Sequence, residues 1–503
     1  MLGVWTTEQV RAAEDRLLAR TPEGALMRKA AFGVAVTAAE MLRSLTGGTA
    51  GRRVTLLVGG GNNGGDALWA GAFLRRRSVA VTAVLLNPDR AHAEGLEALR
   101  RAGGRISDSL DDPDLVVDGI VGLQARGPLR PAAAELVAAV DVPVLAVDLP
   151  SGVDPNTGAV DGPAVRADVT VTFGARKPVH VLNTTHCGEV RLIDIGLGPE
   201  LPDPDLITLE PDDVGYAWRV PGPRDDKYTQ GVTGVAAGSA TYPGAAVLSC
   251  GSAVLATSGM VRYAGYAADV VRGRWPELVA TGTVEDAGRV QAWVVGPGLG
   301  TGQSGRHILR AVLEDAVPTC VDADGITLLA ADPALWDARD PDVPVVLTPH
   351  DREFARIADP LGIELGTDRV AATRALAKRL NSVVLLKGNA TVVAAPDGRT
   401  LVNPATSSWL ATAGSGDVLT GLIGALLATG LDPWLAAGCA AWAHVRAGEL
   451  AAVAGTDVGV PVPASRVLEA IPAAVRAARA VVTPGEPAGA PSTRTPPPGW
   501  SAR

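Results

Sequence analysis

Residues Thr412-Ala413-Gly414-Ser415-Gly416-Asp417-Val418-Leu419 place a turn of small residues and a carboxylate directly before an apolar segment. The apolar spacing predicts a helix over about residues 418–427. The first amides of a helix have no intrahelical partner and the helix dipole is positive there, so this turn is suited to binding an anion. An aspartate at that point can take the proton of a hydroxyl group that attacks a phosphoryl group. The stretch therefore indicates phosphoryl transfer to an alcohol.

Length and composition limit the classes of protein to consider. With 503 residues the chain exceeds the roughly 250–300 residues beyond which one core stops growing, so we expect two domains. Apolar residues make up 47% of the chain and aromatic residues only 4%, so Ala, Val and Leu must form most of the cores. The net charge of −9 argues against nucleic acid or an acidic membrane as the main partner.

The cysteines and the apolar runs bear on cellular location. Cys187, Cys250, Cys320 and Cys439 are scattered without CxxC spacing, so reduced thiols are expected rather than disulfides or a zinc site. The start of the chain lacks an apolar signal stretch, and no run approaches roughly 18 apolar residues. We therefore expect a cytoplasmic protein that does not use a membrane.

Apolar strand-like runs alternate with helical segments through both halves, which predicts an α/β fold of largely parallel sheets with helices on both faces. Thr6-x-x-Gln9 is a capping box before a first helix, and a second helix is expected over residues 24–45. The strands expected are 54–58, 79–85, 115–118, 144–148, 169–173 and 190–195, then 234–237, 292–295, 319–322, 344–347, 383–386 and 391–394. The later helices expected are 242–258, 305–313, 369–380, 416–427 and 433–453.

Proline and acidic residues cluster near residues 198–205, and we expect the domain boundary after this cluster, near residues 205–213. The expected domains are residues 1–208 and 209–483. Residues 484–503 form a tail rich in Pro, Ser, Gly and Thr that cannot build a core, and we expect it to be disordered.

The first candidate site follows the strand at residues 54–58. Gly59-Gly60-Gly61-Asn62-Asn63-Gly64-Gly65-Asp66 lies between this strand and a helix expected to begin near Ala67. Such a glycine-rich turn serves either a tight structural connection or close approach of the backbone to a ligand. Asp118 and Asp148 end two further strands, at the sheet edge where open α/β folds bind ligands. An Asp at such a place is about as often a turn former, but three converging loops favour a site.

Two further observations concern the chemistry of this edge. Asn63, Asp118 and Ser151 supply hard oxygen atoms of low total charge, which suit a monovalent cation better than Zn2+. Lys177 also follows a strand, and it either faces this edge or is a solvated surface lysine.

The motifs GGGNNGGDA, VVDGIVG, VDLPSGVDPNTG and TFGARKP together resemble the N-terminal epimerase domain of the bifunctional NAD(P)H-hydrate repair enzymes over nearly all of residues 1–205. The resemblance implies a Rossmann-like three-layer domain that interconverts the R and S epimers of hydrated NADH or NADPH. It departs from the common pattern at Ala67 and at residues 123–125. The hydrate-binding residues it implies are Asn62, Asn63, Gly64, Gly65, Asp66, Gly122, Leu123, Gln124, Ala125, Arg126, Gly127, Pro128 and Asp148.

The same resemblance implies that Asn63, Asp118 and Ser151 bind potassium. Asp148 and Lys177 are our own candidates for proton transfer at the C6 centre of the substrate.

The second candidate site needs a cradle for a donor phosphate and an acceptor pocket. The stretch Lys387-Gly388-Asn389-Ala390-Thr391 lies between two strands and offers a cation and a polar turn. Gly296-Pro297-Gly298-Leu299-Gly300 and Val321-Asp322-Ala323-Asp324-Gly325 each follow a strand. His350 also follows a strand, and it is either a ligand contact or a satisfied surface histidine.

GSATYPGAA, GPGLG, VDADG, LTPHDREF, LLKGNAT and ATAGSGDVLTG, in this order, resemble the ribokinase-like dehydratase domain of the same repair enzymes over about residues 220–455. The resemblance implies a ribokinase-like α/β domain that uses ADP to remove water from the S hydrate, giving NAD(P)H, AMP and phosphate. The hydrate contacts implied are Ala245, Gly298, His350 and Asp417. The nucleotide contacts implied are Lys387, Gly388, Asn389, Ala390, Thr391 and Gly416.

In this interpretation Asp417 deprotonates the C6 hydroxyl, and Mg2+ is expected because a naked polyphosphate would repel the attacking oxygen. Lys227-Tyr228-Thr229-Gln230-Gly231, Ala413 and Ser415 depart from the usual pattern.

The sequence therefore predicts a fused isomerase and lyase that repairs NAD(P)H hydrate with K+, Mg2+ and the co-substrate ADP. Its partners are expected to be these small molecules, without nucleic acid or membrane, and we expect a homo-oligomer. One alternative is a ribokinase-type kinase of a small hydroxymethyl compound fused to a Rossmann-like binding domain. The other is a non-catalytic nucleotide-sensing module.

Overall fold

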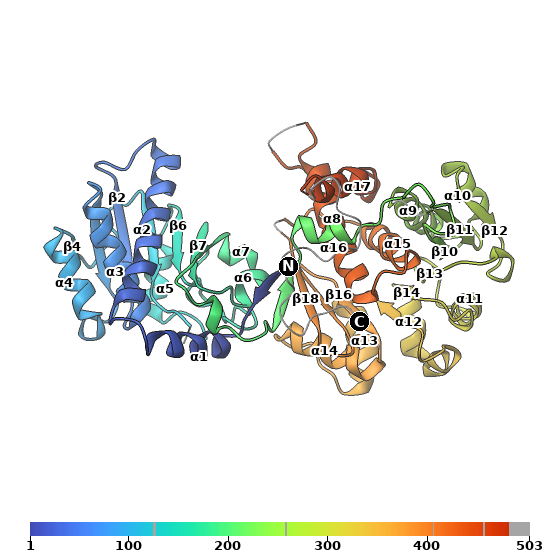
Figure 1. Cartoon of the computed structure of the whole chain (residues 1–503), viewed down its shortest axis with the longest axis horizontal. Coiled ribbons are helices and arrows are strands. Elements are labelled where there is room, and N and C mark those ends of the chain that lie inside the picture. The colour runs from blue at the N-terminus through green and yellow to red at the C-terminus, as the bar shows by residue number, and fades with distance from the viewer. Residues whose placement is uncertain (124–126, 257–258, 406, 456–457, 482–503) are drawn as a thin grey trace. The chain divides into compact units, whose positions relative to one another are not determined.

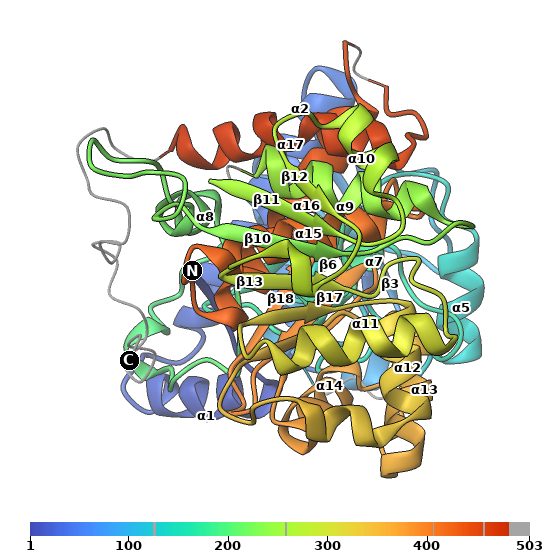
Figure 2. The same cartoon turned by 90° about the vertical axis from the view of Figure 1, so that its right-hand side faces the viewer.

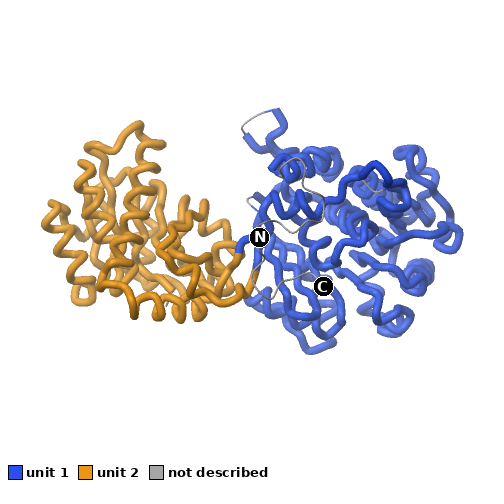
Figure 3. Tube along the Cα trace, in the orientation of Figure 1, with its two compact units in different colours: residues 1–2, 207–503 blue, residues 3–206 orange. Residues whose placement is uncertain are grey.

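The computed structural model describes residues 1–123, 127–256, 259–405, 407–455 and 458–481, so the predictions for residues 124–126 and 484–503 lie outside the described residues. The chain forms two compact units, shown in Figure 3. One unit is Gly3–Leu206, and the other holds Met1–Leu2 and the described residues from Ile207 onward. Residues 1–208 and 209–483 remain our proposal for the two functional domains.

The N-terminal unit contains a seven-stranded sheet of order β4-β3-β2-β5-β6-β7-β8, in which every neighbouring pair is parallel (Figure 1). Its strands are β2 (Arg53–Val58), β3 (Ala80–Leu85), β4 (Arg105–Ile106), β5 (Leu115–Gly119), β6 (Val144–Val147), β7 (Val169–Phe173) and β8 (Glu189–Ile193). Its helices are α1 (Thr7–Leu18), α2 (Ala25–Thr46), α3 (Asn62–Arg75), α4 (Ala93–Arg101), α5 (Pro131–Ala138), α6 (Val179–Leu182), α7 (Thr184–Cys187), η1 (Pro88–Arg90) and η2 (Gly198–Glu200).

Helices cover both faces of this sheet because successive strand side chains point to opposite sides. On β2, Leu56 packs in one apolar cluster with Val34 of α2 and Leu68 of α3. Leu57, the next residue, belongs to a second cluster with Ala133 of α5. The predicted three-layer, Rossmann-like arrangement is therefore confirmed.

The C-terminal unit is built on a second sheet, in which the neighbouring strands run β9-β18-β17-β16-β15-β14-β13-β10-β11-β12. Its strands are β10 (Val232–Ala236), β11 (Met260–Ala264), β12 (Val279–Thr281), β13 (Ala292–Val295), β14 (Thr319–Val321), β15 (Val345–Leu347), β16 (Val383–Leu386), β17 (Ala390–Ala394) and β18 (Thr400–Pro404), while β1 (Leu2–Val4) and β9 (Leu206–Thr208) include residues of both units. Pairs β16–β17 and β17–β18 are antiparallel, and the pairs from β12 across to β16 are parallel.

Helices also lie on both sides of this sheet, as Figure 2 shows. They are α8 (Pro211–Ala217), α9 (Pro243–Leu255), α10 (Ala268–Arg274), α11 (Gln303–Glu314), α12 (Asp324–Ala331), α13 (Asp351–Ala358), α14 (Arg369–Leu380), α15 (Ser415–Ala428), α16 (Pro433–Ala452), α17 (Ala464–Arg479), η3 (Glu285–Ala287), η4 (Pro333–Ala338) and η5 (Asp359–Leu361). Within the described ranges, no helix has the length and apolarity needed to cross a membrane.

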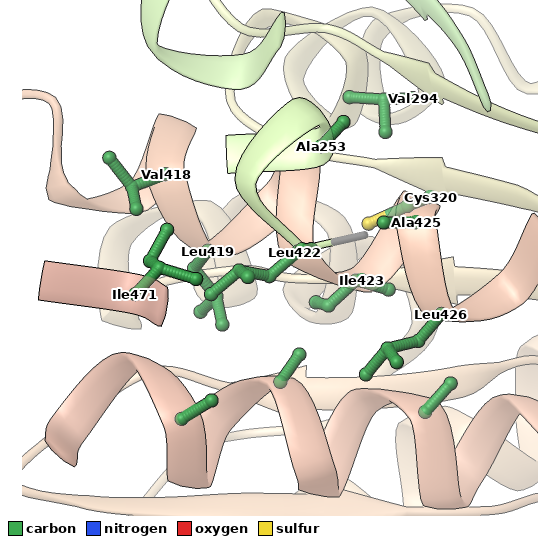
Figure 4. Packing of buried hydrophobic residues seen from close by; sticks show 14 of the residues in the cluster. Ala253, Val294, Cys320, Val418, Leu419, Leu422, Ile423, Ala425, Leu426 and Ile471 are labelled. Carbon is green, nitrogen blue, oxygen red and sulfur yellow. The ribbon is translucent and has the colours of Figure 1, made fainter. Parts of the chain in front are cut away.

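Helix α15 is embedded in the core of the C-terminal unit. Its apolar residues pack against α9, α17 and the strands that carry Val294 and Cys320 (Figure 4). Gly424 allows the close approach, because a Cβ there would lie 2.2 Å from Cγ2 of Val294. The start of α15, which carries Asp417, is therefore held on a rigid element.

Two helix starts differ from the prediction. Helix α3 begins at Asn62 rather than near Ala67, and α15 begins at Ser415, before both predicted starts at Gly416 and Val418. Because glycine is unfavourable inside a helix, the predicted helices exclude glycines that in fact belong to their first turns. In the structure Gly64 lies in the first turn of α3. Only glycine fits there, because a Cβ would be 2.3 Å from the carbonyl oxygen of Gly59. Tight packing, rather than backbone freedom, explains that glycine.

Candidate active sites

The first site lies where the strand order of the N-terminal sheet reverses. Strand β2 pairs with β3 on one side and β5 on the other, so the loops after β2 and β5 diverge at a topological switch point. These two loops are in direct contact, since the amide of Gly59 donates to the carbonyl oxygen of Gly119 at 3.0 Å. A Cβ on Gly59 would lie 1.8 Å from the carbonyl oxygen of Ile120. The glycine run is therefore required where the two loops meet.

The three predicted potassium ligands converge at this point. The fully buried carboxylate of Asp118 accepts from the Ser151 hydroxyl at 2.7 Å, the Ser151 amide at 2.8 Å and the Ile120 amide at 3.1 Å. Burial raises the pKa of Asp118 to about 6, against the hydrogen bonds from Ser151 that lower it. The Asn63 amide nitrogen donates to the carbonyl oxygen of Val121 at 2.9 Å, beside this group.

Asp148 and Lys177 form a buried ion pair. The Lys177 ammonium contacts Oδ1 of Asp148 at 2.6 Å and the Thr172 hydroxyl at 2.8 Å, and Lys177 is only 1% exposed. Asp148 has a φ of 68°, in the left-handed region that L residues rarely adopt. Such backbone strain is typical of functional sites. The interpretation of Lys177 as a solvated surface residue is wrong.

His180 locks this pair in position. Its Nδ1 accepts from the Lys177 amide at 3.0 Å, so its Nε2 carries the proton and donates to the carbonyl oxygen of Asp148 at 2.8 Å. Burial, followed by the positive charge of Lys177, lowers the pKa of His180 to about 4. The ring is therefore neutral at physiological pH. Sequence reasoning gave His180 no role, although it lies three residues after Lys177.

The structure brings some of the predicted hydrate-binding residues together. A Cβ on Gly122 would lie 3.3 Å from Oδ1 of Asn63, so the loop after β5 lies against the start of α3. Asp66 is buried, and its Oδ1 has no hydrogen-bond partner among the described residues. Burial raises the pKa of Asp66 well above its usual value, and the negative charges of Asp148 and Glu14 add to the effect. Leu123, Gly127 and Pro128 flank residues 124–126, which lie outside the described residues.

The second site also lies at a switch point, since β10 pairs with both β11 and β13. The loops after β10 and β13 touch, because the Gly238 amide donates to the carbonyl oxygen of Pro297 at 2.7 Å. A Cβ on Gly298 would lie 3.0 Å from Cβ of Ala245 and 2.9 Å from Cβ of Tyr242. The predicted substrate residues Ala245 and Gly298 are therefore neighbours, and the half-exposed Tyr242 lies beside them.

Asp417 lies in the first turn of α15, behind a turn that positions it. Gly414 has a φ of 85°, and the Ser415 hydroxyl donates to the carbonyl oxygen of Leu410 at 2.8 Å. The Ser249 hydroxyl of α9 donates to the carbonyl oxygen of Asp417 at 3.1 Å. Burial raises the pKa of Asp417 to about 7, with Asp322 and Asp324 raising it further and Lys387 lowering it. A carboxylate that exchanges a proton near neutral pH is suited to general base catalysis.

An ion pair at the end of β14 links the elements that the sequence predicts to bind phosphate. Lys387 Nζ contacts Oδ1 of Asp322 at 2.8 Å and lies 3.7 Å from Oε2 of Glu353. Burial favours the neutral amine, but Asp322 and Glu353 outweigh it and the pKa of Lys387 is raised. The Thr420 hydroxyl of α15 donates to the other oxygen of Asp322 at 2.8 Å. Asp322 thus holds Lys387 against the start of α15, a role the sequence did not assign.

The turn after Lys387 is fixed at both ends. Arg369 donates to the carbonyl oxygen of Lys387 at 2.9 Å, and the Ala405 amide donates to the carbonyl oxygen of Asn389 at 2.9 Å. Gly388 and Asn389 are exposed at its tip, while Ala390 and Thr391 belong to β17.

His350 is the N-cap of α13 and is half exposed. Its Nδ1 accepts from the amides of Arg352 and Glu353 at 3.1 and 3.3 Å, which places the ring proton of neutral His350 on Nε2. Glu353 in turn has its Oε2 3.7 Å from Nζ of Lys387, so His350 and Lys387 share a neighbour. His350 is therefore partly satisfied by the helix through Nδ1, and its Nε2 lies 3.5 Å from Oε1 of Glu353.

The pKa of Asp417 predicts the pH dependence of the second site. A general base works only without its proton, so we expect kcat/KM for the S hydrate to rise as the pH increases through about 7 and then to level off. Initial rates on both sides of neutrality measure this. A rate that falls across the same interval contradicts the role of Asp417 as a base.

Comparison with known proteins gives consistent results for both units. Residues 23–179 match the family model described as YjeF-related protein N-terminus, and residues 233–473 match that of NAD(P)H-hydrate dehydratase. The bifunctional NAD(P)H-hydrate repair enzyme Nnr of Mycobacterium tuberculosis is 58% identical over 435 residues, covering 86% of this chain and 90% of the relative. The Mycobacterium leprae enzyme of the same name is 55% identical over 481 residues, covering 95% and 100%.

Among solved structures, an ADP/ATP-dependent NAD(P)H-hydrate dehydratase from Bacillus subtilis, co-crystallised with ATP and Mg2+, is 26% identical. The match covers 54% of this chain and 99% of that chain, with a TM-score of 0.48.

Two α/β units, each with a switch point at its sheet edge and a carboxylate near a lysine, have the architecture of an enzyme with two domains. The length and identity of the matches identify which enzyme family this is. The chain belongs to the bifunctional NAD(P)H-hydrate repair enzymes, with an epimerase domain followed by a dehydratase domain.

Proposed function

We propose that this chain epimerises hydrated NADH and NADPH in its N-terminal domain and dehydrates the S epimer in its C-terminal domain at the expense of ADP, giving NAD(P)H, AMP and phosphate. The single observation that best supports this is Asp417, a carboxylate with a pKa of about 7 at the start of α15, beside the Lys387–Asp322 pair. This arrangement provides a base for a hydroxyl and a cation for a phosphate at one sheet edge.

In the dehydratase site, Asp417 takes the proton of the C6 hydroxyl as that oxygen attacks the nucleotide's terminal phosphoryl group. Amides at residues 414–416 and the Lys387 ammonium stabilise the negative charge on the phosphoryl oxygens. The phosphate ester is a better leaving group than hydroxide, so electrons from the ring nitrogen expel it. Ala245, Gly298 and His350 would contact the hydrate.

Mg2+ would neutralise the polyphosphate charge when bound. Among the described residues, the carboxylates close enough to form an all-protein metal cluster are Glu210, Asp212 and Asp213, and Asp417 is not in that set. Mg2+ is usually held by one or two carboxylates together with phosphate and water oxygens. The small number of carboxylates near Asp417 fits this preference. Asp324 is the candidate to hold the ion, because among the described residues its Oδ2 accepts from the Gly300 amide at 2.8 Å and its Oδ1 makes no hydrogen bond.

Gly416→Ala tests the position of the nucleotide. A Cβ on Gly416 would lie 3.6 Å from Lys387 Nζ and 3.6 Å from Oδ2 of Asp322, which is ordinary contact, so the fold should tolerate it. The methyl group would project beside the lysine expected to meet a phosphate. We expect the KM for ADP to rise about tenfold or more with an unchanged Tm. Gly273→Ala in α10, where a Cβ meets nothing within 4 Å, is the matched control. An unchanged KM would place the nucleotide elsewhere.

In the epimerase site, Asn62 to Asp66, the residues 122–128 and Asp148 would hold the hydrate. Asn63, Asp118 and Ser151 would bind K+. Their donors are an amide oxygen, a carboxylate and a hydroxyl, which are hard ligands of low charge, and the buried Asp118 gains from a nearby cation. Potassium would offset the negative charge of Asp118 and fix the loops after β5 and β6.

Removing potassium should therefore slow epimerisation. We expect exchange of K+ for choline to lower the rate of R-to-S conversion about tenfold or more, because the ligand loops lose their common partner. Dehydration of supplied S hydrate should be unchanged in the same buffer. Equal epimerisation in both buffers would contradict the potassium site.

The test of the whole proposal supplies the R hydrate alone with ADP, Mg2+ and K+. Recovery of the NADH absorbance requires both activities, first epimerisation and then dehydration. A stable phosphorylated product without NADH would instead favour the kinase alternative. Nucleotide binding without any turnover would favour the sensing module.

We further propose a cytoplasmic location and a homo-oligomeric state. Sedimentation of the full chain measures the second, and a single monomeric species would contradict it.

A further inference from the structure

Glu14 is a carboxylate on the buried face of α1. The buried residues of this helix are Thr7, Val10, Ala13 and Leu17. Glu14 lies seven residues after Thr7 and three before Leu17, so it is on the same face of the helix as these buried residues. The position would suit an apolar residue, and it instead carries a partly buried acid.

The start of α1 is tied to the loops of the epimerase site. The Thr7 amide donates to Oδ1 of Asn156 at 3.0 Å, and the Asn156 amide group donates back to the Thr7 hydroxyl at 3.0 Å. The Trp5 amide donates to the carbonyl oxygen of Arg176 at 2.9 Å. Asn156 is in the loop that follows Asp148, and Arg176 directly precedes Lys177. These bonds hold the start of the helix against the loops that carry the buried ion pair.

Glu14 shares an electrostatic cluster with three groups of that site. Its charge interacts with Lys177 and Asp148, and also with that of Asp66, while Arg11 and Asp15 act on it from its own helix. Burial raises the pKa of Glu14 to about 7, an effect that Lys177 opposes and Asp148 reinforces. Glu14 is thus coupled to the charges of Asp66, Asp148 and Lys177, and it can hold or release a proton near neutral pH.

We propose that Glu14 is a third proton-transferring residue of the epimerase site, acting on the C6 hydroxyl together with the Asp148–Lys177 pair. The inference rests on the proposed epimerase function of this site. Protonated Glu14 donates its proton to the hydroxyl as the C6–O bond breaks, and water leaves. The lone pair of N1 forms a C6=N1 bond, giving a cationic ring that the carboxylates stabilise.

Water then adds to the opposite face of C6, and the C6=N1 electron pair returns to N1. The added water loses a proton to Asp148, so one proton is given and one is taken and no redox change occurs. In the reverse direction the two carboxyl groups exchange roles. The R-to-S direction as written needs the proton on Glu14, so its rate falls once the pH is high enough to remove that proton.

The test compares Glu14→Gln with the control Glu8→Gln, which makes the same change at an exposed carboxylate of the same helix. We expect Glu14→Gln to lower kcat for R-to-S conversion about 100-fold with little change in KM. The decline of the wild-type rate above about pH 7 should disappear. Glu14→Asp should keep that decline, and Glu8→Gln should keep both the wild-type rate and its pH profile.

Three outcomes are decisive. Wild-type kcat and pH profile in Glu14→Gln overturn the inference. A changed KM or Tm with an unchanged pH profile also overturns it, because it shows a purely structural residue. Absence of epimerisation in the wild-type chain itself, with dehydration of the S hydrate intact, refutes the proposed epimerase function instead.

Discussion

Asp417→Asn should abolish dehydration of the S hydrate while the chain remains folded. Asparagine has nearly the same shape but cannot accept the proton of the C6 hydroxyl. Loss of a general base typically costs about 100-fold to 10,000-fold in rate, and we expect a decrease in this range or beyond. The assay is recovery of NADH absorbance from purified S hydrate with ADP and Mg2+. Turnover that survives the change would show that another group is the base.

A stability measurement separates this effect from unfolding. The pKa of folded Asp417 is raised to about 7 from the usual value of 3.8, so the folded state binds this proton more tightly than the unfolded state. Stability is therefore lost as the pH rises from about 4 to 7, and the loss persists above 7. Asp417→Asn removes this penalty, so its Tm should exceed that of the wild type at pH 8 and match it at pH 4.

The control is Asp397→Asn. Asp397 is an exposed carboxylate in the turn between β17 and β18, where it pairs with Arg399. Its removal should leave the dehydration rate unchanged. Loss of activity in both variants would point to a general effect of charge rather than to the base.

Lys177→Met should have the largest effect on the N-terminal domain. Lys177 is 1% exposed, and its removal leaves the carboxylate of Asp148 buried without its cation. Breaking a buried ion pair from one side costs about 3–5 kcal/mol. We therefore expect a clear fall in the Tm of the N-terminal domain and loss of epimerisation, measured by calorimetry and by R-to-S conversion.

The double variant Lys177→Met with Asp148→Asn distinguishes stability from chemistry. It removes both charges, so the desolvation penalty of the lone carboxylate disappears and much of the lost stability should return. Epimerisation should stay absent, because both members of the Asp148–Lys177 pair are gone. Dehydration of supplied S hydrate should continue in both variants. Epimerisation at the wild-type rate in the single variant would exclude Lys177 from the reaction.

Much of the fold could be predicted because local patterns agreed with the final packing. The runs at residues 169–173, 292–295 and 383–386 are strands with the predicted bounds, and α14 begins and ends where its pattern does. The capping box of Thr6 and Gln9 forms as predicted. In each case the apolar period matches the face that is buried.

Other elements escaped prediction because their residues carry weak local signals. Strand β12 has three residues, and β11 and β18 lack a clear alternation of apolar and polar residues. For β18 a signal was present, since Pro396-Asp397-Gly398 is a turn sequence and the Ala395 amide bonds to the carbonyl oxygen of Arg399. The pairing of such strands depends on neighbours distant in the chain.

The sequence by itself determined the two α/β units and which loops carry polar groups, because periodicity and strand-end motifs are local properties. Only the tertiary structure decided how those groups act on one another. Burial raises the pKa of Asp417, His180 locks the Asp148–Lys177 pair, and Asp322 links Lys387 to α15. Glu14 reaches the first site from a helix far away in the chain. Charge coupling and desolvation depend on distance in space, which separation along the chain does not reveal.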